Sequence, residues 1–163
     1  MNAYMWNTFC PTLFGTGASK EVGNKAKELG MHKIMVCTEH ALCEFKVATQ
    51  VIDVLKEEGF EVFVFDKCKA DAPSDICDEG AAYVREHGID GIVAVGGGST
   101  LDTAKAIGII ISQNGTTIRD YYGVGEDAVL RRAKAIAGTR HHIYHSRPHG
   151  NGYALLLRLE NLK

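Results

Sequence analysis

The chain has 163 residues, of which 45% are hydrophobic and 23% charged, and its formal net charge is −2. These values are typical of one compact globular domain and argue against a disordered or fibrous chain. No stretch reaches the roughly 20 apolar residues of a membrane-spanning helix, and the first residues lack a basic flank followed by an apolar run. We therefore expect a cytoplasmic protein with no membrane partner. Its five cysteines include no Cys-x-x-Cys pair, which favours reduced thiols.

The sequence of the first half predicts a helix, then a strand, then a second helix. The first helix is expected to begin at Ser19 and to end at Gly30. A short apolar strand follows over residues 33–37, and apolar residues then recur at spacings of three and four from Leu42 to Leu55, with Phe45 among them. This spacing predicts one amphipathic helix.

The next segments continue the same alternation. Residues 60–65 alternate and are rich in Val and Phe, which predicts a strand. Ser74 is expected to cap a helix that ends before Gly88, and residues 92–95 form a third apolar run. Regular alternation of strands and helices predicts an α/β fold, with a Rossmann-like parallel sheet and helices on both faces.

The third run leads into the most informative motif of the chain. Gly96, Gly97 and Gly98 are followed by Ser99 and Asp102. Glycines let the backbone approach a bulky anion, and the N–H groups that open the next helix point toward it. Ser99 and Asp102 have the spacing of a capping box, so a purely structural turn is the alternative. Three glycines in a row exceed what a turn needs, and we interpret the motif as a phosphate-binding loop.

Two common nucleotide motifs do not fit. Leu101 stands where the Gly-x-Gly-x-x-Gly fingerprint requires a glycine, and no Gly-Lys-Ser/Thr triplet is present. Instead, the segment from Gly96 to Lys105 resembles the Gly-Gly-Gly-Ser-x-x-Asp-x-Ala-Lys motif of the iron-containing alcohol dehydrogenase family. Three further segments resemble that family in the same order: residues 14–17, 36–39 and 120–123. The resemblance spans residues 9 to about 134. Dehydroquinate synthases and zinc-dependent glycerol dehydrogenases share the glycines, but Ser99 and the segment at 120–123 favour the iron-type enzymes.

The resemblance implies a cofactor site. The backbone of residues 96–99 would hold the pyrophosphate of NAD(P), and Glu39 would face the adenosine ribose. A carboxylate accepts hydrogen bonds from ribose hydroxyls and repels a 2′-phosphate, so NAD is expected rather than NADP. The alternative for Glu39 is a solvated residue in the first turn of a helix. Ala72 stands where the family commonly has an asparagine that contacts the cofactor.

The resemblance ends near residue 134. Residues 1–127 hold 11 lysines and arginines against 19 aspartates and glutamates, whereas residues 128–163 hold 7 against 1. Relatives continue with a segment on the nicotinamide half of the cofactor and then with an all-helical domain that binds iron through an aspartate and histidines. No aspartate follows Asp127, so we predict no catalytic residue and no metal site in this chain, and we expect the family's helical domain to be absent from it. We expect a nucleotide-binding domain over residues 1–134 and a divergent basic tail over residues 135–163.

Three interpretations of the tail stay open. His141, His145 and His149 recur every four residues, which would align them on one helix face as zinc ligands, although Pro148 opposes such a helix. The arginines could contact nucleic acid, but the preceding acidic residues would repel it, so no nucleic-acid partner is expected. An irregular basic segment is the third interpretation, and we hypothesise that it is a non-native, out-of-frame end.

By resemblance, the complete enzyme would transfer hydride between a small alcohol or aldehyde and nicotinamide, with iron polarising the substrate oxygen. The chain itself is expected to bind nucleotide and to lack turnover. The alternative is a non-catalytic nucleotide-binding or partner module. Loss of the second domain would expose apolar surface, which favours a homo-oligomer.

Overall fold

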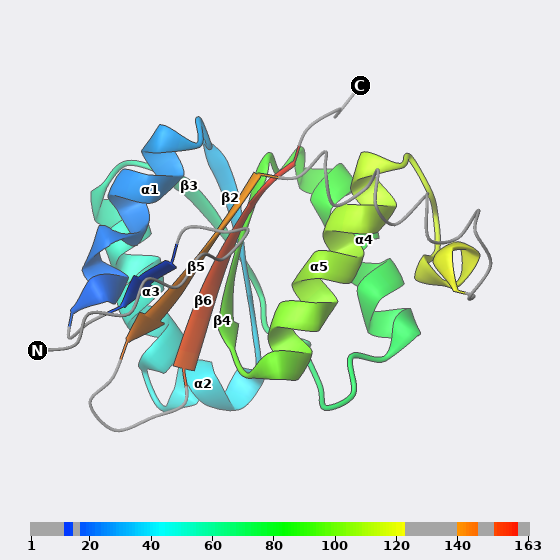
Figure 1. Cartoon of the computed structure of the whole chain (residues 1–163), viewed down its shortest axis with the longest axis horizontal. Coiled ribbons are helices and arrows are strands. Elements are labelled where there is room, and N and C mark those ends of the chain that lie inside the picture. The colour runs from blue at the N-terminus through cyan, green and yellow to red at the C-terminus, as the bar shows by residue number, and fades with distance from the viewer. Residues whose placement is uncertain (1–11, 15–16, 123–139, 147–151, 160–163) are drawn as a thin grey trace, which may run out of the picture.

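A computed structural model describes residues 12–14, 17–122, 140–146 and 152–159 (Figure 1). Its strands are β1 (Thr12–Phe14), β2 (Lys33–Thr38), β3 (Glu61–Phe65), β4 (Gly91–Gly96), β5 (Arg140–Ser146) and β6 (Gly152–Arg158). Its helices are η1 (Ala18–Glu21), α1 (Val22–Glu28), α2 (His40–Glu44), α3 (Val47–Glu57), α4 (Ser74–His87), α5 (Gly98–Ser112) and η2 (Ile118–Tyr121). None of the helices in these ranges has both the length and the apolar character that a bilayer crossing requires.

The six strands form one sheet in the order β1-β5-β6-β4-β2-β3. β2 lies between β3 and β4 and is parallel to both, which confirms the predicted parallel sheet. β6 runs antiparallel to β4, and β5 runs antiparallel to β6, so the sheet is mixed beyond β4. β1 completes the other edge and is parallel to β5.

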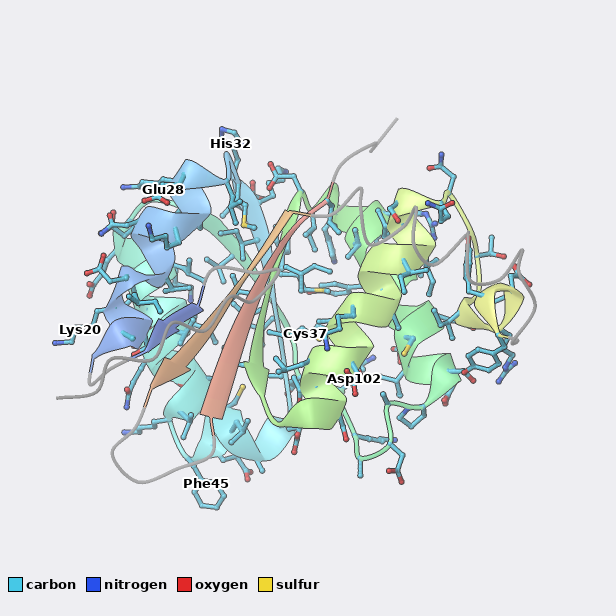
Figure 2. All side chains as sticks on the ribbon, in the orientation of Figure 1. Lys20, Glu28, His32, Cys37, Phe45 and Asp102 are labelled. Carbon is cyan, nitrogen blue, oxygen red and sulfur yellow. The ribbon has the colours of Figure 1, made fainter. Side chains whose placement is uncertain are left out.

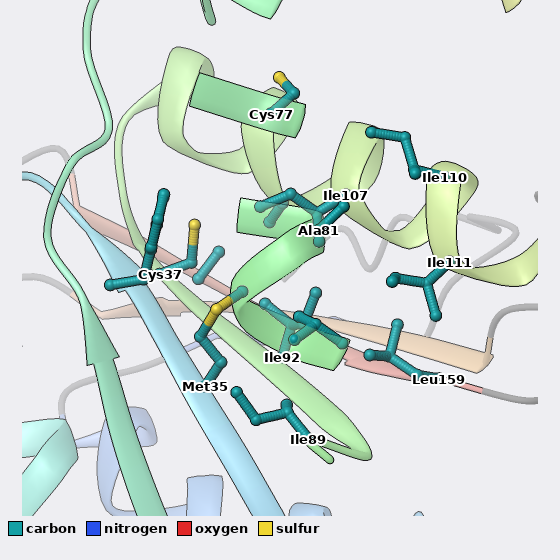
Figure 3. Packing of buried hydrophobic residues seen from close by; sticks show 14 of the residues in the cluster. Met35, Cys37, Cys77, Ala81, Ile89, Ile92, Ile107, Ile110, Ile111 and Leu159 are labelled. Atoms are coloured by element: carbon teal, nitrogen blue, oxygen red, sulfur yellow. The ribbon is translucent and has the colours of Figure 1, made fainter. Parts of the chain in front are cut away.

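Helices cover both faces of the parallel strands, as the sequence predicts. Ile34 and Val36 of β2 pack with α1 and α3, whereas Met35 and Cys37 pack with α4 and α5. This division follows from the two-residue period of a strand, which sends successive side chains to opposite faces. Figure 1 shows the two helical layers on either side of the sheet, and Figure 3 shows the second core, where Ile92 of β4 lies among the residues packed between sheet and helices.

The predicted helix across residues 42–55 is in fact two helices. α2 ends at Glu44 and α3 begins at Val47, because Lys46 adopts a left-handed backbone with φ of 58°. The break turns Phe45 outward, and 76% of its surface is exposed (Figure 2). The expectation that Phe45 belongs to the inner face is therefore wrong.

Two predicted helix caps are also wrong. Pro73, not Ser74, is the N-cap of α4, and the Ser74 hydroxyl instead accepts hydrogen bonds from the Arg119 side chain. Ser19 lies inside η1, whose N-cap is Gly17. The predicted helix ends are confirmed at Gly30 and Gly88, which both adopt positive φ next to the last turn.

The expected irregular tail contains two regular strands, β5 and β6. β6 coincides with an apolar run over residues 154–157, which suits a strand between two neighbours. The helix that would align the tail histidines does not form, because His141 and His145 lie in β5. His149 lies outside the described residues, as does the whole segment 123–139.

Candidate functional site

The candidate site lies at the carboxyl end of β4, where the chain turns into α5. β4 ends at Gly96, Gly97 is the N-cap of α5, and Gly98 is its first residue. In an open α/β sheet this junction between a strand and a helix N-terminus is where nucleotides bind. The fold thus brings the glycine motif to the edge that the sequence predicts.

The three glycines differ in what surrounds them. A Cβ at Gly96 would overlap the side chain of Thr100, so this position has no room for any other residue. A Cβ at Gly97 or Gly98 would meet nothing within 4 Å. Among the described residues, the turn therefore packs closely on its inner side and is open on its outer side.

The N-terminus of α5 has donors to offer. The N–H of Leu101 makes the first helical bond to the carbonyl of Gly97, at 3.1 Å. The N–H groups that precede it have no acceptor within the helix, and no side chain among the described residues caps them. The positive end of a 15-residue helix thus faces the open side of the turn.

The predicted capping box does not form. The helix begins at Gly98, two residues earlier than a Ser99 cap predicts, so Ser99 is already helical and its Oγ instead accepts from the N–H of Asp71 at 3.2 Å. The Asp102 carboxylate accepts from Lys105 at 3.0 Å, and its side chain is 65% exposed. Figure 2 shows Asp102 on α5. The structure therefore gathers Gly96, Gly97, Gly98 and Ser99 at the turn but pairs Asp102 with a neighbour on the helix.

Glu39 reaches the same site from the neighbouring strand. It follows β2 directly and has an extended backbone at the N-cap of α2, so it is not a solvated residue of a first helical turn. Its Oε1 accepts a hydrogen bond of 2.9 Å from the hydroxyl of Thr100. The glycine turn and the predicted ribose carboxylate are thus joined through one threonine.

Three buried threonines at this edge are residues of the candidate site that sequence reasoning missed. Thr38, Thr100 and Thr103 are fully buried, and each hydroxyl has a partner at the carboxyl edge of the sheet. Thr38 donates to the carbonyl of Val95 at 2.7 Å, and Thr103 donates to the carbonyl of Ser99 at 2.9 Å. Thr38 therefore ties the end of β2 to that of β4, and Thr103 braces the first turn of α5. The alternation of apolar and polar residues gives no signal for such contacts.

A third segment, residues 66–72, closes over this edge. Lys67 pairs by a backbone bridge with Glu39, and Asp71 donates to Ser99. Asp71 and Ala72 both have positive φ, of 61° and 44°. Asparagine tolerates this conformation better than alanine, which gives a backbone reason for the family's asparagine at position 72.

Metal ligands do not gather in the described residues, since no three His, Cys, Asp or Glu side chains there are arranged to hold an ion. The glycine cradle fits a dinucleotide phosphate, because its outer side is open and lined by main-chain donors. The described residues thus offer room and main-chain donors for a phosphate group at this turn.

Comparisons with known proteins show the family of the chain. Residues 11–138 match the family described as iron-containing alcohol dehydrogenase. The NAD-dependent methanol dehydrogenase of Bacillus methanolicus is 37% identical over 122 residues, which cover 74% of this chain and 32% of that protein. The choline dehydrogenase of Bacillus subtilis is 39% identical over 107 residues, which cover 66% of this chain and 26% of that protein.

Solved structures give the same result. The sulfoacetaldehyde reductase of Bifidobacterium kashiwanohense, in complex with NAD+, is 28% identical with a TM-score of 0.63 and covers 76% of this chain and 33% of its own. The alcohol dehydrogenase of Oenococcus oeni is 30% identical with a TM-score of 0.65 over the same shares. The chain spans about a third or less of the length of these relatives. By its sequence, its sheet and its glycine turn, it belongs to the iron-containing alcohol dehydrogenase family.

Proposed function

We propose that this chain is the nucleotide-binding part of an NAD-dependent alcohol dehydrogenase and that it binds NAD. The observation that carries the proposal is the open turn at Gly97 and Gly98, with uncapped N–H groups at the start of α5. Two phosphates of a dinucleotide suit this place because they accept main-chain hydrogen bonds and favour the positive end of the helix. Gly96, Gly97, Gly98 and Ser99 would hold the diphosphate.

Glu39 would set the preference for NAD over NADP. Its Oε1 is engaged by Thr100, and its second oxygen has no partner among the described hydrogen bonds, so it can accept from ribose hydroxyls. A 2′-phosphate at the same place would meet a carboxylate and be repelled. Asp102 contributes to this site only through the field at the start of α5, since its carboxylate is paired with Lys105.

The chain is proposed to bind cofactor without turning over. NAD, when bound in a complete enzyme of this kind, supplies the carbon that accepts hydride from an alcohol or returns it to an aldehyde. This chain's residues would anchor and orient the dinucleotide. Since the described residues hold no iron site, purified chain should not reduce NAD with a small alcohol, even with ferrous ion added. The cytoplasmic location and self-association stay predictions.

The division of the chain is part of the same proposal. Residues 1–134 would be the nucleotide-binding unit, and residues 135–163 a segment whose sequence is out of frame with the gene of a longer enzyme. Sequencing the parent gene tests this. A one-nucleotide shift should restore the family's segment that follows residue 134, and failure to restore it would contradict the hypothesis.

Calorimetric titration tests nucleotide binding. NAD and ADP-ribose should bind comparably, because both carry the adenosine and diphosphate that the described residues would contact, and NADP should bind more weakly. Gly97→Asp should abolish measurable binding, whereas Gly97→Asn, equal in size but neutral, should still bind NAD, at least roughly tenfold more tightly than Gly97→Asp. A Cβ at position 97 meets no atom of the described residues within 4 Å, so the difference in affinity between Gly97→Asp and Gly97→Asn measures the effect of the negative charge. No heat from NAD or ADP-ribose would favour the alternative of a non-binding partner module.

A further inference from the structure

Two cysteine thiols face each other at the carboxyl edge of β2. The Sγ atoms of Cys37 and Cys68 lie 3.2 Å apart. Cys37 is the fifth residue of β2 and is fully buried, and Cys68 follows β3 by three residues and is 6% exposed. Figure 3 shows Cys37 on the face of the sheet that α4 and α5 cover.

The backbone already holds the pair in position. β2 and β3 are parallel neighbours, and Cys37 is in register with Phe65, the last residue of β3. Beyond that strand, the N–H of Cys68 donates to the carbonyl of Thr38 at 3.1 Å. A disulfide has an S–S distance of about 2.05 Å, so the two sulfur atoms need to approach by little more than 1 Å.

We propose that Cys37 and Cys68 form an intramolecular disulfide when the protein meets a peroxide. The Cys68 thiolate attacks one peroxide oxygen, the O–O bond breaks, and Cys68 becomes a sulfenic acid while the other oxygen leaves as water after protonation. Cys37 then attacks the Cys68 sulfur, its thiol proton leaves with the hydroxyl as a second water, and the S–S bond forms. Two thiols thus lose two electrons and two protons to the peroxide. The reaction is independent of the proposed function.

The surroundings assign Cys68 as the first thiol to react. A hydrogen bond from Cys37 lowers the pKa of Cys68. The same hydrogen bond, together with burial, raises the pKa of Cys37. The thiolate is the reactive form of cysteine, and Cys68 is also the more accessible of the two. Cys77 makes a contrast, because burial raises its pKa to about 11 and its Sγ is directed to the carbonyl of Ala72 at 3.8 Å.

The disulfide would join β2 to the segment that closes over the glycine turn. Cys68 stands next to Lys67, which bridges to Glu39, and its segment also carries Asp71, which bonds to Ser99. A covalent link between Cys37 and Cys68 therefore fixes this segment against the sheet. Oxidation should make the chain more resistant to unfolding, since a cross-link removes conformations from the unfolded state.

Peptide mapping of the full chain tests the proposal. The protein is treated with hydrogen peroxide, its remaining thiols are alkylated, and it is digested with trypsin and a glutamate-specific protease. The sequence allows cleavage after Lys33, Glu39, Lys67 and Lys69, which separates Cys37 from Cys43 and Cys68 from Cys77. We expect a cross-linked peptide of residues 34–39 with residues 68–69, lighter than the sum of its parts by two hydrogens and absent after reduction.

Variants distinguish this pair from the other thiols. Cys43→Ser and Cys77→Ser should form the cross-link at the parent's rate, whereas Cys37→Ser should accumulate a sulfenic acid at Cys68 that dimedone traps. Alkylation of Cys37 and Cys68 in the peroxide-treated parent, with oxidation at other cysteines instead, would overturn the proposal. So would a cross-link from Cys68 to Cys77 or to a second copy of the chain. The parent's own map decides the result even where a variant does not fold.

Discussion

Thr100 joins the two halves of the candidate site through a single hydroxyl. Its Oγ1 donates to Glu39 at 2.9 Å, and its side chain fills the space that a Cβ at Gly96 would need. The hydroxyl has one proton to donate, and Glu39 receives it. Thr100 therefore fixes both the close turn of the glycine motif and the direction of the carboxylate expected to contact ribose.

Replacing Thr100 by valine should weaken the discrimination between NAD and NADP. Valine keeps the branched shape that packs under Gly96 but removes the donor, so the Glu39 carboxylate loses its anchor. A hydrogen bond to a charged group contributes about 1.5–3 kcal/mol, so we expect the ratio of the two dissociation constants to fall by roughly tenfold or more. Calorimetric titration of both nucleotides measures that ratio. Thr100→Ser, which retains the hydroxyl, should keep the parent's ratio of dissociation constants. An unchanged ratio in Thr100→Val would show that Thr100 does not position the Glu39 carboxylate.

The residues of the turn could be predicted from sequence only in part. Three consecutive glycines after a buried strand predict an open cradle, and the structure has one. The capping role of Ser99 could not be decided, because Ser99 and Asp102 have the right spacing but the helix starts at Gly98. Thr100 was missed because its partner stands 61 positions away in the chain. A local pattern carries no information on a contact that only the fold creates.

The break between α2 and α3 shows that helical spacing of apolar residues does not by itself predict one continuous helix. Apolar residues continue at helical spacing across Phe45, yet Lys46 turns the chain with positive φ. Helix α2 is short and has no fully buried residue, although its half-buried Leu42 and Cys43 pack against the core beside α1 and α3. At its start, Nδ1 of His40 lies 2.6 Å from Oδ2 of Asp66, just past β3. Local propensity cannot reveal a contact between His40 and Asp66, because these residues stand 26 positions apart in the chain.

This contact should make part of the stability depend on pH. The hydrogen bond and the charge of Asp66, and then the charge of Glu44, raise the pKa of His40 above 6.5. A raised pKa means that the folded chain binds the proton more tightly, so the contribution is complete below pH 6.5, while Asp66 stays ionised, and is lost as pH rises through the folded pKa. A nuclear magnetic resonance titration should give a midpoint above 6.5 that falls in Asp66→Asn and falls less in Glu44→Gln. Equal midpoints in the parent and Asp66→Asn would refute the pairing.

The contact between α4 and α5 depends on a glycine. A Cβ at Gly80 of α4 would overlap the end of the Ile107 side chain on α5, and Ile107 is fully buried. Gly80→Ala should improve helix propensity by about 1 kcal/mol, but crowding a packed core costs about 1–3 kcal/mol. We therefore expect a net loss of about 1 kcal/mol in the free energy of unfolding, measured with denaturant.

A second substitution separates crowding from other causes. Ile107→Val removes the terminal methyl that the new Cβ meets, so Gly80→Ala combined with Ile107→Val should unfold with a higher free energy than Gly80→Ala alone. Ala82→Ser, on the exposed side of α4, should change the free energy of unfolding by less than about 0.5 kcal/mol. Additive effects of Gly80→Ala and Ile107→Val would show that the two helices do not meet at this point.

For the molecule as a whole, the sheet is more complete than the sequence predicts. The net charge changes from acidic to basic near residue 128, and the alternation of predicted strands and helices ends there, which indicated an irregular tail. β6 nevertheless pairs with β4 along six residue positions, and β5 carries β1 at the far edge. Leu159 lies in the core with α4 and α5 and is 3% exposed, and its N–H donates to the carbonyl of Asp90 at 3.0 Å. Strand pairing across such a separation could not be predicted, because it depends on the free edge that β4 presents.

Deletion of residues 135–163 tests what these strands contribute. Without them β4 becomes an edge strand with unpaired N–H and C=O groups, β1 loses its partner, and the core around Leu159 opens. The shortened chain should therefore unfold at lower denaturant concentration and sediment as larger species, because an open β4 edge pairs with other copies. The matched control is Leu159→Ala in the full chain, which should lower the free energy of unfolding by about 2–5 kcal/mol while keeping the strands. If the shortened chain keeps the parent's unfolding midpoint and stays monomeric, β5 and β6 do not stabilise the sheet, and the parallel strands β3-β2-β4 with their helices stand alone.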